Sequence, residues 1–265
     1  MHRAASAYGA AEDPEQAPHM KKNRKPGWKT AWQAARATDR KPAPSRTLLR
    51  LTDVSRSYGD RSVLHGVTME LATAECTVLV GDNGSGKSTL LRLACGRERP
   101  TSGEVLFDGE PLHEDSPRTR ARVATVMEAG TAYPDLTVRE HLMLVAVGHG
   151  LGRRADEAVD RALAGHRLAD HAGSRPSALS SGQTQALLLA SAFVRPHELL
   201  VLDEPEQRLD ARARTELAER LSDHKRRGTA ILLATHDAAL AAAVADHVLT
   251  LEDGRATVAP AGSHR

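Results

Sequence analysis

A glycine-rich stretch between residues 81 and 89 is the part of this chain best suited to chemistry. It lies between the apolar run 77–80 and the helix-like run 90–94, and it reads Gly81, Asp82, Asn83, Gly84, Ser85, Gly86, Lys87, Ser88 and Thr89. A strand, a glycine turn and a helix N-terminus together are typical of a phosphate-binding loop, because glycines let successive backbone N–H groups point at phosphate oxygens. In such a loop, Lys87 would reach the β- and γ-phosphates and the Ser88 hydroxyl would ligate Mg²⁺.

Two later apolar segments each end in polar side chains that fit the same chemistry. Residues 199–202 lead into Asp203 and Glu204, and residues 232–234 lead, one residue on, into His236. Beside a phosphate-binding loop, Asp203 can hold Mg²⁺ and Glu204 can polarise an attacking water. His236 can then contact the γ-phosphate and help to hold that water.

The elements that must position these side chains follow from the apolar pattern. Residues 199–202, 230–234 and 248–251 are short runs of the buried-strand type, separated by helical patterns, which predicts a parallel sheet of βα units and an α/β fold. Residues 49–71 are expected to form short strands of period two, and residues 136–175 follow a helical pattern.

Composition limits the class of protein. The chain has 265 residues, of which 40% are hydrophobic, enough for a real core in one or two domains. The two cysteines, Cys76 and Cys95, imply no disulfide framework and favour a reducing compartment. No apolar run approaches the roughly 20 residues that span a bilayer. We therefore expect a cytoplasmic protein whose membrane role, if any, comes through a partner or the surface.

Residues 1–46 differ in composition from the rest of the chain. They carry ten Lys and Arg against four Asp and Glu, whereas the whole chain has a net charge of +2, so the basic excess belongs to this segment. We expect a disordered extension here, because the segment has few aliphatic residues to bury. The alternatives are a basic amphipathic helix on an anionic membrane, carrying Trp28 and Trp32, and a true start at Met20.

One further motif identifies a family. Leu179, Ser180, Ser181, Gly182 and Gln183 open an apolar helix between the phosphate-binding loop and Asp203. With the motifs above, in this order, the chain resembles the ATP-binding cassette (ABC) ATPases over about residues 47–256. The resemblance implies a phosphate-loop NTPase domain over residues 47–265. That domain would have a mostly parallel sheet core, an antiparallel β subdomain and a helical subdomain at about 132–178.

The family pattern assigns roles to matching positions. Gly81 to Thr89 match the Walker A loop, with Lys87 among the catalytic residues. Tyr58 matches the aromatic residue that stacks on adenine. Asp203 matches the Walker B magnesium residue, and Glu204 and His236 match the catalytic carboxylate and the switch histidine. Ser180, Gly182 and Gln183 match the signature, which contacts ATP bound to a second cassette.

Two positions depart from the family pattern. Glu128 stands where a Q-loop glutamine is usual, and no Gln occurs between Gln33 and Gln183 to replace it. A carboxylate at this position is expected to ligate Mg²⁺, and it adds negative charge near a triphosphate, so we expect altered coupling or slower turnover rather than a dead site. Ser181 stands where the signature usually has glycine, which adds a side chain where backbones approach closely.

The resemblance implies an ATP- and Mg²⁺-dependent ATPase subunit of a transporter. It would lie on the cytoplasmic face of the membrane, drive separate membrane-spanning permease subunits and pair with a second ABC ATPase subunit, identical or not. Residues 135–142, followed by Gly150 and Leu151, match a sequence pattern often met in export-type cassettes, which favours export over import. The alternative is a soluble ABC ATPase that acts on ribosomes, DNA or cluster assembly; with one cassette and no long insertion, we expect no nucleic acid partner.

Overall fold

The structure is a computed structural model that describes residues 46–127 and 132–261. The predicted extension, apart from Arg46, and the position of Glu128 lie outside these residues. Within them, no helix combines the length and the apolar character that crossing a bilayer requires.

A six-stranded sheet forms the centre of the domain. Its strand order is β10-β9-β3-β8-β7-β6, and all neighbours pair in parallel except β10, which is antiparallel to β9. The strands, in the order of the sheet, are Arg255–Pro260, His247–Glu252, Cys76–Val80, Ala230–Ala234, Leu199–Asp203 and Val123–Val126. This arrangement confirms the predicted mostly parallel α/β core.

Both faces of this sheet are buried, and alternate residues of each strand face different cores. On β7, Leu199 and Val201 belong to one core, and Leu200 and Leu202 belong to another. The first core contains α2 (Lys87–Ala94), which packs between the two sheets. The second contains residues of α6 (Ser181–Phe193), α7 (Ala211–Arg226) and α8 (Ala238–Val244). Burial on both sides explains why these strands read as continuous apolar runs rather than alternating ones.

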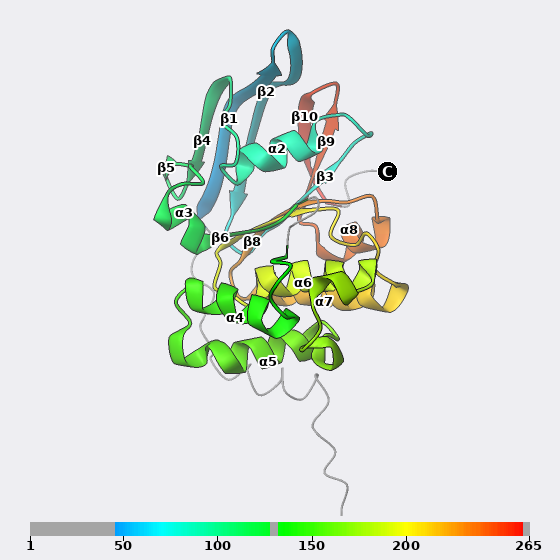
Figure 1. Ribbon diagram of the computed structural model, residues 1–265. Coiled ribbons are helices and arrows are strands. Elements are labelled where there is room, and N and C mark those ends of the chain that lie inside the picture. The colour runs from blue at the N-terminus through cyan, green and yellow to red at the C-terminus, as the bar shows by residue number, and fades with distance from the viewer. Residues whose placement is uncertain (1–45, 128–131, 262–265) are drawn as a thin grey trace, which may run out of the picture. The chain divides into compact units, whose positions relative to one another are not determined.

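A four-stranded antiparallel sheet packs beyond α2 (Figure 1), with strand order β2-β1-β4-β5. Its strands are β1 (Thr47–Tyr58), β2 (Arg61–Ala72), β4 (Ser102–Phe107) and β5 (Glu110–Pro111). The sequence predicted short strands here, whereas β1 and β2 each run for 12 residues and shift register several times. Asp53 lies at one such irregularity with φ +49°, and a Cβ on Gly103 would come within 2.2 Å of the Asp53 carbonyl oxygen. Because bulges break the period of two, sequence periodicity divided each long strand into pieces.

Helices complete the domain, and some of them form a separate core. Their bounds are α3 (Pro117–Arg122), α4 (Val138–Gly148), α5 (Ala155–Gly165), α6 (Ser181–Phe193), α7 (Ala211–Arg226) and α8 (Ala238–Val244), with 3-10 turns at Gly152–Arg154, Ala169–His171 and Pro176–Ala178. A third core joins α4 and α5 to one side of α6 (Figure 1). The other side of α6 packs in the core beneath the six-stranded sheet. The helical part was predicted at about 132–178, and its core also includes residues of α6, which follow that range.

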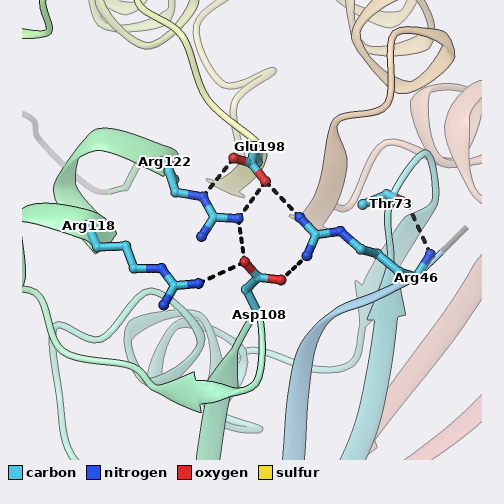
Figure 2. A network of polar contacts seen from close by, with 6 residues as sticks. All are labelled: Arg46, Thr73, Asp108, Arg118, Arg122 and Glu198. Atoms are coloured by element: carbon cyan, nitrogen blue, oxygen red, sulfur yellow. Dashed lines mark hydrogen bonds and ion pairs between the residues drawn. The ribbon is translucent and has the colours of Figure 1, made fainter. Parts of the chain in front are cut away.

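A network of arginines and carboxylates ties the two sheets together (Figure 2). Asp108, just after β4, accepts hydrogen bonds from Arg118 at 2.9 Å and Arg122 at 2.8 Å, and also pairs with Arg46. Glu198, just before β7, takes two 2.6 Å hydrogen bonds from Arg122, which holds the pKa of Glu198 below its usual range. The network holds the edge of the antiparallel sheet against the amino end of β7.

Three histidines, the buried His166 and the half-buried His197 and His224, cluster where the helical part meets α7. His197 and His224 stack with ring centroids 5.0 Å apart, and Phe193 lies 4.8 Å from His224 and 5.6 Å from His166. Burial lowers the pKa of His197 to about 4 and that of His166 to about 3, and it lowers the pKa of His224 well below its usual value. Nearby cations, Arg195, Arg220 and Arg227, further disfavour protonation of the three rings.

The histidine cluster predicts a loss of stability in mild acid. Between the usual histidine pKa of about 6.5 and these lowered values, the unfolded chain binds more protons than the folded chain, so the free energy of unfolding falls as pH falls. We expect a loss of about 1 kcal/mol for each of the three histidines between pH 7 and pH 5.5. Urea unfolding at both pH values will show it, and His224→Phe, which keeps the ring stack, should reduce the loss by about one third.

The same substitution at exposed His113 serves as the control. If the free energy of unfolding changes equally with pH in wild type and His224→Phe, the surroundings of His224 do not disfavour its protonated form.

Candidate active site

The glycine-rich loop joins β3 to α2 in the way its sequence predicts. Gly81 directly follows β3 with φ +151°, and a Cβ there would lie 2.3 Å from the Leu251 carbonyl oxygen. Gly86 caps α2 with φ +107°, and a Cβ there would lie 2.8 Å from the Leu64 side chain. Any other residue at these two positions would strain the backbone and clash, so the loop conformation depends on glycine.

The side chains of this loop are held close to its backbone. The Lys87 ammonium donates to the carbonyl oxygens of Gly81 at 2.7 Å and Asp82 at 2.9 Å, and Lys87 is buried. The buried Oγ of Ser85 has no hydrogen-bond partner in the described part of the chain. Ser88 and Thr89 begin the first turn of α2 with Lys87. A ligand with acceptor oxygens would satisfy both the loop N–H groups and the Ser85 hydroxyl.

A cleft of about 660 Å³ opens beside the loop. Its walls come from the loop, from the start of β2 and from the turn between β9 and β10, and they are Arg61, Ser62, Val63, His65, Asp82, Asn83, Gly84, Ser85, Leu251, Glu252, Asp253 and Gly254. Acidic side chains outnumber basic ones in this lining. Attraction for a phosphate therefore comes from the backbone N–H groups, the N-terminus of α2 and Lys87 rather than from a basic surface.

The turn between β9 and β10 is a wall that the sequence reasoning missed. His65 N donates to the Gly254 carbonyl oxygen at 2.8 Å, and a Cβ on Gly254 would lie 2.3 Å from the Val63 carbonyl oxygen. The pair Asp253-Gly254 is a strong local signal for a hairpin turn. No local signal shows that this turn packs against residues 63–65.

Tyr58 lies at the end of β1 and is 41% exposed. The guanidinium carbon of Arg56 lies 4.5 Å from the ring centroid, and the Tyr58 hydroxyl donates to Glu98. The residues that line the cleft do not include Tyr58. One ring face is covered by Arg56, so a base can stack only on the other.

The carboxyl ends of β7 and β8 bring the predicted catalytic pair together. The backbone N–H of Glu204 donates to the Ala234 carbonyl oxygen at 2.9 Å, directly after the paired positions Asp203 and Ala234. Glu204 Oε1 then lies 3.3 Å from Nε2 of His236. Since α2 packs on β7 and β8, and β8 pairs with β3, these side chains share the sheet edge with the glycine loop.

The signature residues open α6 and form its cap. Ser180 Oγ accepts from the Gln183 N–H at 3.3 Å, and Gln183 Oε1 accepts from the Ser180 N–H at 2.8 Å, which is a capping box. Gln183 also contacts His171 at 2.7 Å. A Cβ on Gly182 would lie 2.8 Å from the Arg208 carbonyl oxygen, so this helix start packs on the segment after Glu204.

A second cleft, of about 330 Å³, lies between α4, α6 and the core. Its lining includes His141, Val145 and His149 of α4, and also Met127, the residue before Glu128. Its lining, as far as the structure describes it, includes three arginines, Arg97, Arg120 and Arg195, and one acid, Glu114. Glu128 itself lies outside the described residues, so its expected role at Mg²⁺ stays a prediction.

Known proteins are similar to this chain in sequence. The Nod factor export ATP-binding protein I of Rhizobium etli is 35% identical over 210 residues, which cover 79% of this chain and 66% of that protein. The sn-glycerol-3-phosphate import ATP-binding protein of Paracoccus denitrificans is 36% identical over 206 residues, 77% of this chain and 58% of that protein. The chain thus spans about two thirds or less of the length of these relatives.

Solved structures agree with the sequence relatives. The structure of the ATP-binding subunit of an ABC transporter has a TM-score of 0.76 and 32% identity, and the match covers 81% of this chain and 90% of that one. A dimeric ATP-binding cassette in a post-hydrolysis state, bound to ADP and phosphate, has a TM-score of 0.72 at 22% identity over 80% of this chain and 98% of that one, which supports the fold.

The family model for ABC transporters matches residues 64–207, from β2 past the carboxylate pair. That span contains the glycine loop, the signature and Glu204, and the sequence interpretation of an ABC nucleotide-binding domain is confirmed. The chain therefore belongs to the ABC transporter family, as a nucleotide-binding domain of its ATPase class.

Proposed function

We propose that this chain binds and hydrolyses ATP to drive transport through separate membrane subunits, and that it works on the cytoplasmic face of the membrane. The observation that carries the proposal is the sheet edge where the glycine loop, Asp203 and the Glu204–His236 pair come together. Few reactions other than nucleotide hydrolysis need a loop that binds a triphosphate, a carboxylate that binds a metal ion and two side chains that orient a water molecule in one site.

The residues at this edge fit MgATP. The Ser85 hydroxyl, which has no hydrogen-bond partner among the described residues, and the loop N–H groups suit phosphate oxygens. Lys87 would exchange the carbonyls of Gly81 and Asp82 for these oxygens. Ser88 and Asp203 offer one hydroxyl and one carboxylate oxygen, as Mg²⁺ prefers when substrate phosphates supply further ligands. Bound there, Mg²⁺ would neutralise charge on the phosphate oxygens. Tyr58 would stack on adenine with the ring face that Arg56 leaves free.

Hydrolysis would begin with a water held between the catalytic pair and the γ-phosphate. Glu204 would orient this water and accept its proton, and His236, 3.3 Å from the same carboxylate, would fix the carboxylate and contact the γ-phosphate. Lys87 would stabilise the charge that develops as the bond to the leaving phosphate lengthens.

A second cassette subunit would complete the site. Within this chain Ser180, Gly182 and Gln183 are contacted by residues of their own cap, by Arg208 and by His171. In a head-to-tail pair, Ser180 and Gly182 of one subunit would reach the ATP of the other, as the family pattern implies. The N-terminus of α6 would there add its partial positive charge to the γ-phosphate.

The membrane-spanning permease would dock on the helical part. Among the described residues that line it, the second cleft has three arginines and one acid, so it suits a short acidic or carbonyl-rich segment. Beside it, α4 exposes the large apolar side chains Leu144 and Val147, which are 48% and 55% exposed. Export is our proposed direction, since several similar relatives are named for Nod factor export; a relative named for sn-glycerol-3-phosphate import is as similar in sequence.

The dimer can be tested with Glu204→Gln in the full chain. An amide does not accept a proton from water, so hydrolysis should slow by about 100-fold or more and ATP should persist between two subunits. Light scattering should show a dimer with MgATP and a monomer with MgADP. Glu219→Gln, at an exposed position of α7, is the control. Unchanged turnover in Glu204→Gln would remove Glu204 from the mechanism.

Docking can be tested on α4. The pair Leu144→Glu and Val147→Glu should leave ATP hydrolysis by the isolated chain within twofold of wild type. It should abolish retention in membranes that contain the permease subunits that this chain drives. Val258→Glu, an exposed apolar position on β10 that is 44% exposed, should be retained like wild type. Retention of the α4 variant would place the membrane contact elsewhere.

A further inference from the structure

Glu204 leaves β7 in an unusual backbone conformation. Its φ is +45°, in the left-handed region that costs a residue with a side chain about 1 kcal/mol or more. Its N–H is nevertheless bonded to the Ala234 carbonyl oxygen, so the backbone at this point is pinned to β8. The turn that follows, residues 204–207, is therefore fixed at its start.

Gln207 closes this turn and reaches back to the catalytic carboxylate. Its backbone N–H donates to the Glu204 carbonyl oxygen at 3.1 Å, and its side-chain amide donates to Glu204 Oε2. The other oxygen, Oε1, faces His236 at 3.3 Å. Both carboxylate oxygens of Glu204 thus have a partner, which restricts rotation of the carboxylate.

Glu206 holds the other member of the pair. Its side chain is buried, and Oε1 accepts from the Thr235 hydroxyl at 2.5 Å and from the His236 N–H at 3.3 Å. Thr235 Oγ1 in turn accepts from the Asp237 N–H at 3.0 Å. The buried oxygen Oε2 of Glu206 has no hydrogen-bond partner in the described part of the chain. A buried polar atom without a partner lowers stability, which indicates that Glu206 has a role at the site.

We propose that Gln207 and Glu206 are positioning residues for hydrolysis, Gln207 acting through the Glu204 carboxylate and Glu206 acting through the backbone of His236. This inference rests on the proposed function, in which Glu204 and His236 orient the attacking water. Neither residue touches the phosphates in this proposal. Their effect is to hold a base and its partner within the small range of geometry that an in-line attack allows.

The test uses steady-state ATP hydrolysis by the full chain. Gln207→Met keeps the length of the side chain and loses the donor, so kcat should fall about tenfold while KM for MgATP changes less than twofold. Gln207→Asn keeps an amide on a side chain that is one methylene shorter, and its kcat should lie between those of wild type and Gln207→Met. Arg212→Met, at an exposed position of α7, is the control for side-chain loss and should match wild type.

The role of Glu206 is tested with two variants of Thr235, the residue whose hydroxyl donates to it. Thr235→Val removes the hydroxyl and should lower kcat about tenfold, and Thr235→Ser, which restores a hydroxyl, should recover most of the activity.

A double-mutant cycle separates positioning from general damage. In a Glu204→Gln background, Gln207→Met should have no further effect on the residual rate, because its partner acid is already absent. An equal loss in both backgrounds would overturn the inference for Gln207, as would wild-type kcat in Gln207→Met while Glu204→Gln is inactive. Wild-type kcat in Glu204→Gln would instead overturn the proposed function on which the inference rests.

Discussion

Parallel pairing of β3, β8 and β7 brings three distant parts of the chain to one edge of the six-stranded sheet. Leu79 pairs with Ala234, and Ala234 pairs with Asp203, so the three strands end level with one another. Whatever follows each strand must then emerge at the same place. A slip of one residue in any pairing would exchange the buried faces of that strand, so the two apolar cores fix the register and, with it, the site.

Backbone N–H groups provide much of the attraction between this site and an anion. The cleft beside the loop carries more acidic than basic side chains, and the one buried ammonium, among the described residues, is that of Lys87. Selectivity for a phosphate ester therefore depends on N–H groups aimed by Gly81 and Gly86, and on the α2 terminus. The glycines are needed because Leu251 and Leu64 leave no room for a Cβ.

The sequence predicted the parts that local pattern determines. Lys87, Asp203 and His236 follow buried strands, and apolar runs of this kind identify a parallel sheet whose edge collects what comes after each strand. The partners of those residues were missed because they depend on tertiary contacts. The turn at Gly254 becomes a wall only through residues 63–65, and the long antiparallel strands were hidden by bulges. The contact of Glu206 with Thr235 likewise joins residues that are 29 positions apart in the chain.

Helix α6 belongs to two cores at once. Leu187, Ala190 and Val194 pack with α4 and α5, while Leu189 and Ala192 pack beneath the six-stranded sheet. Its amides are therefore released to solvent only when both cores open, so their hydrogen exchange reports the unfolding of the whole domain. Exchange in α4 and α5 reports only the opening of the smaller core. The capping box of Ser180 begins this helix, so the residues proposed to meet a second subunit lie at the start of an element that two cores hold in place.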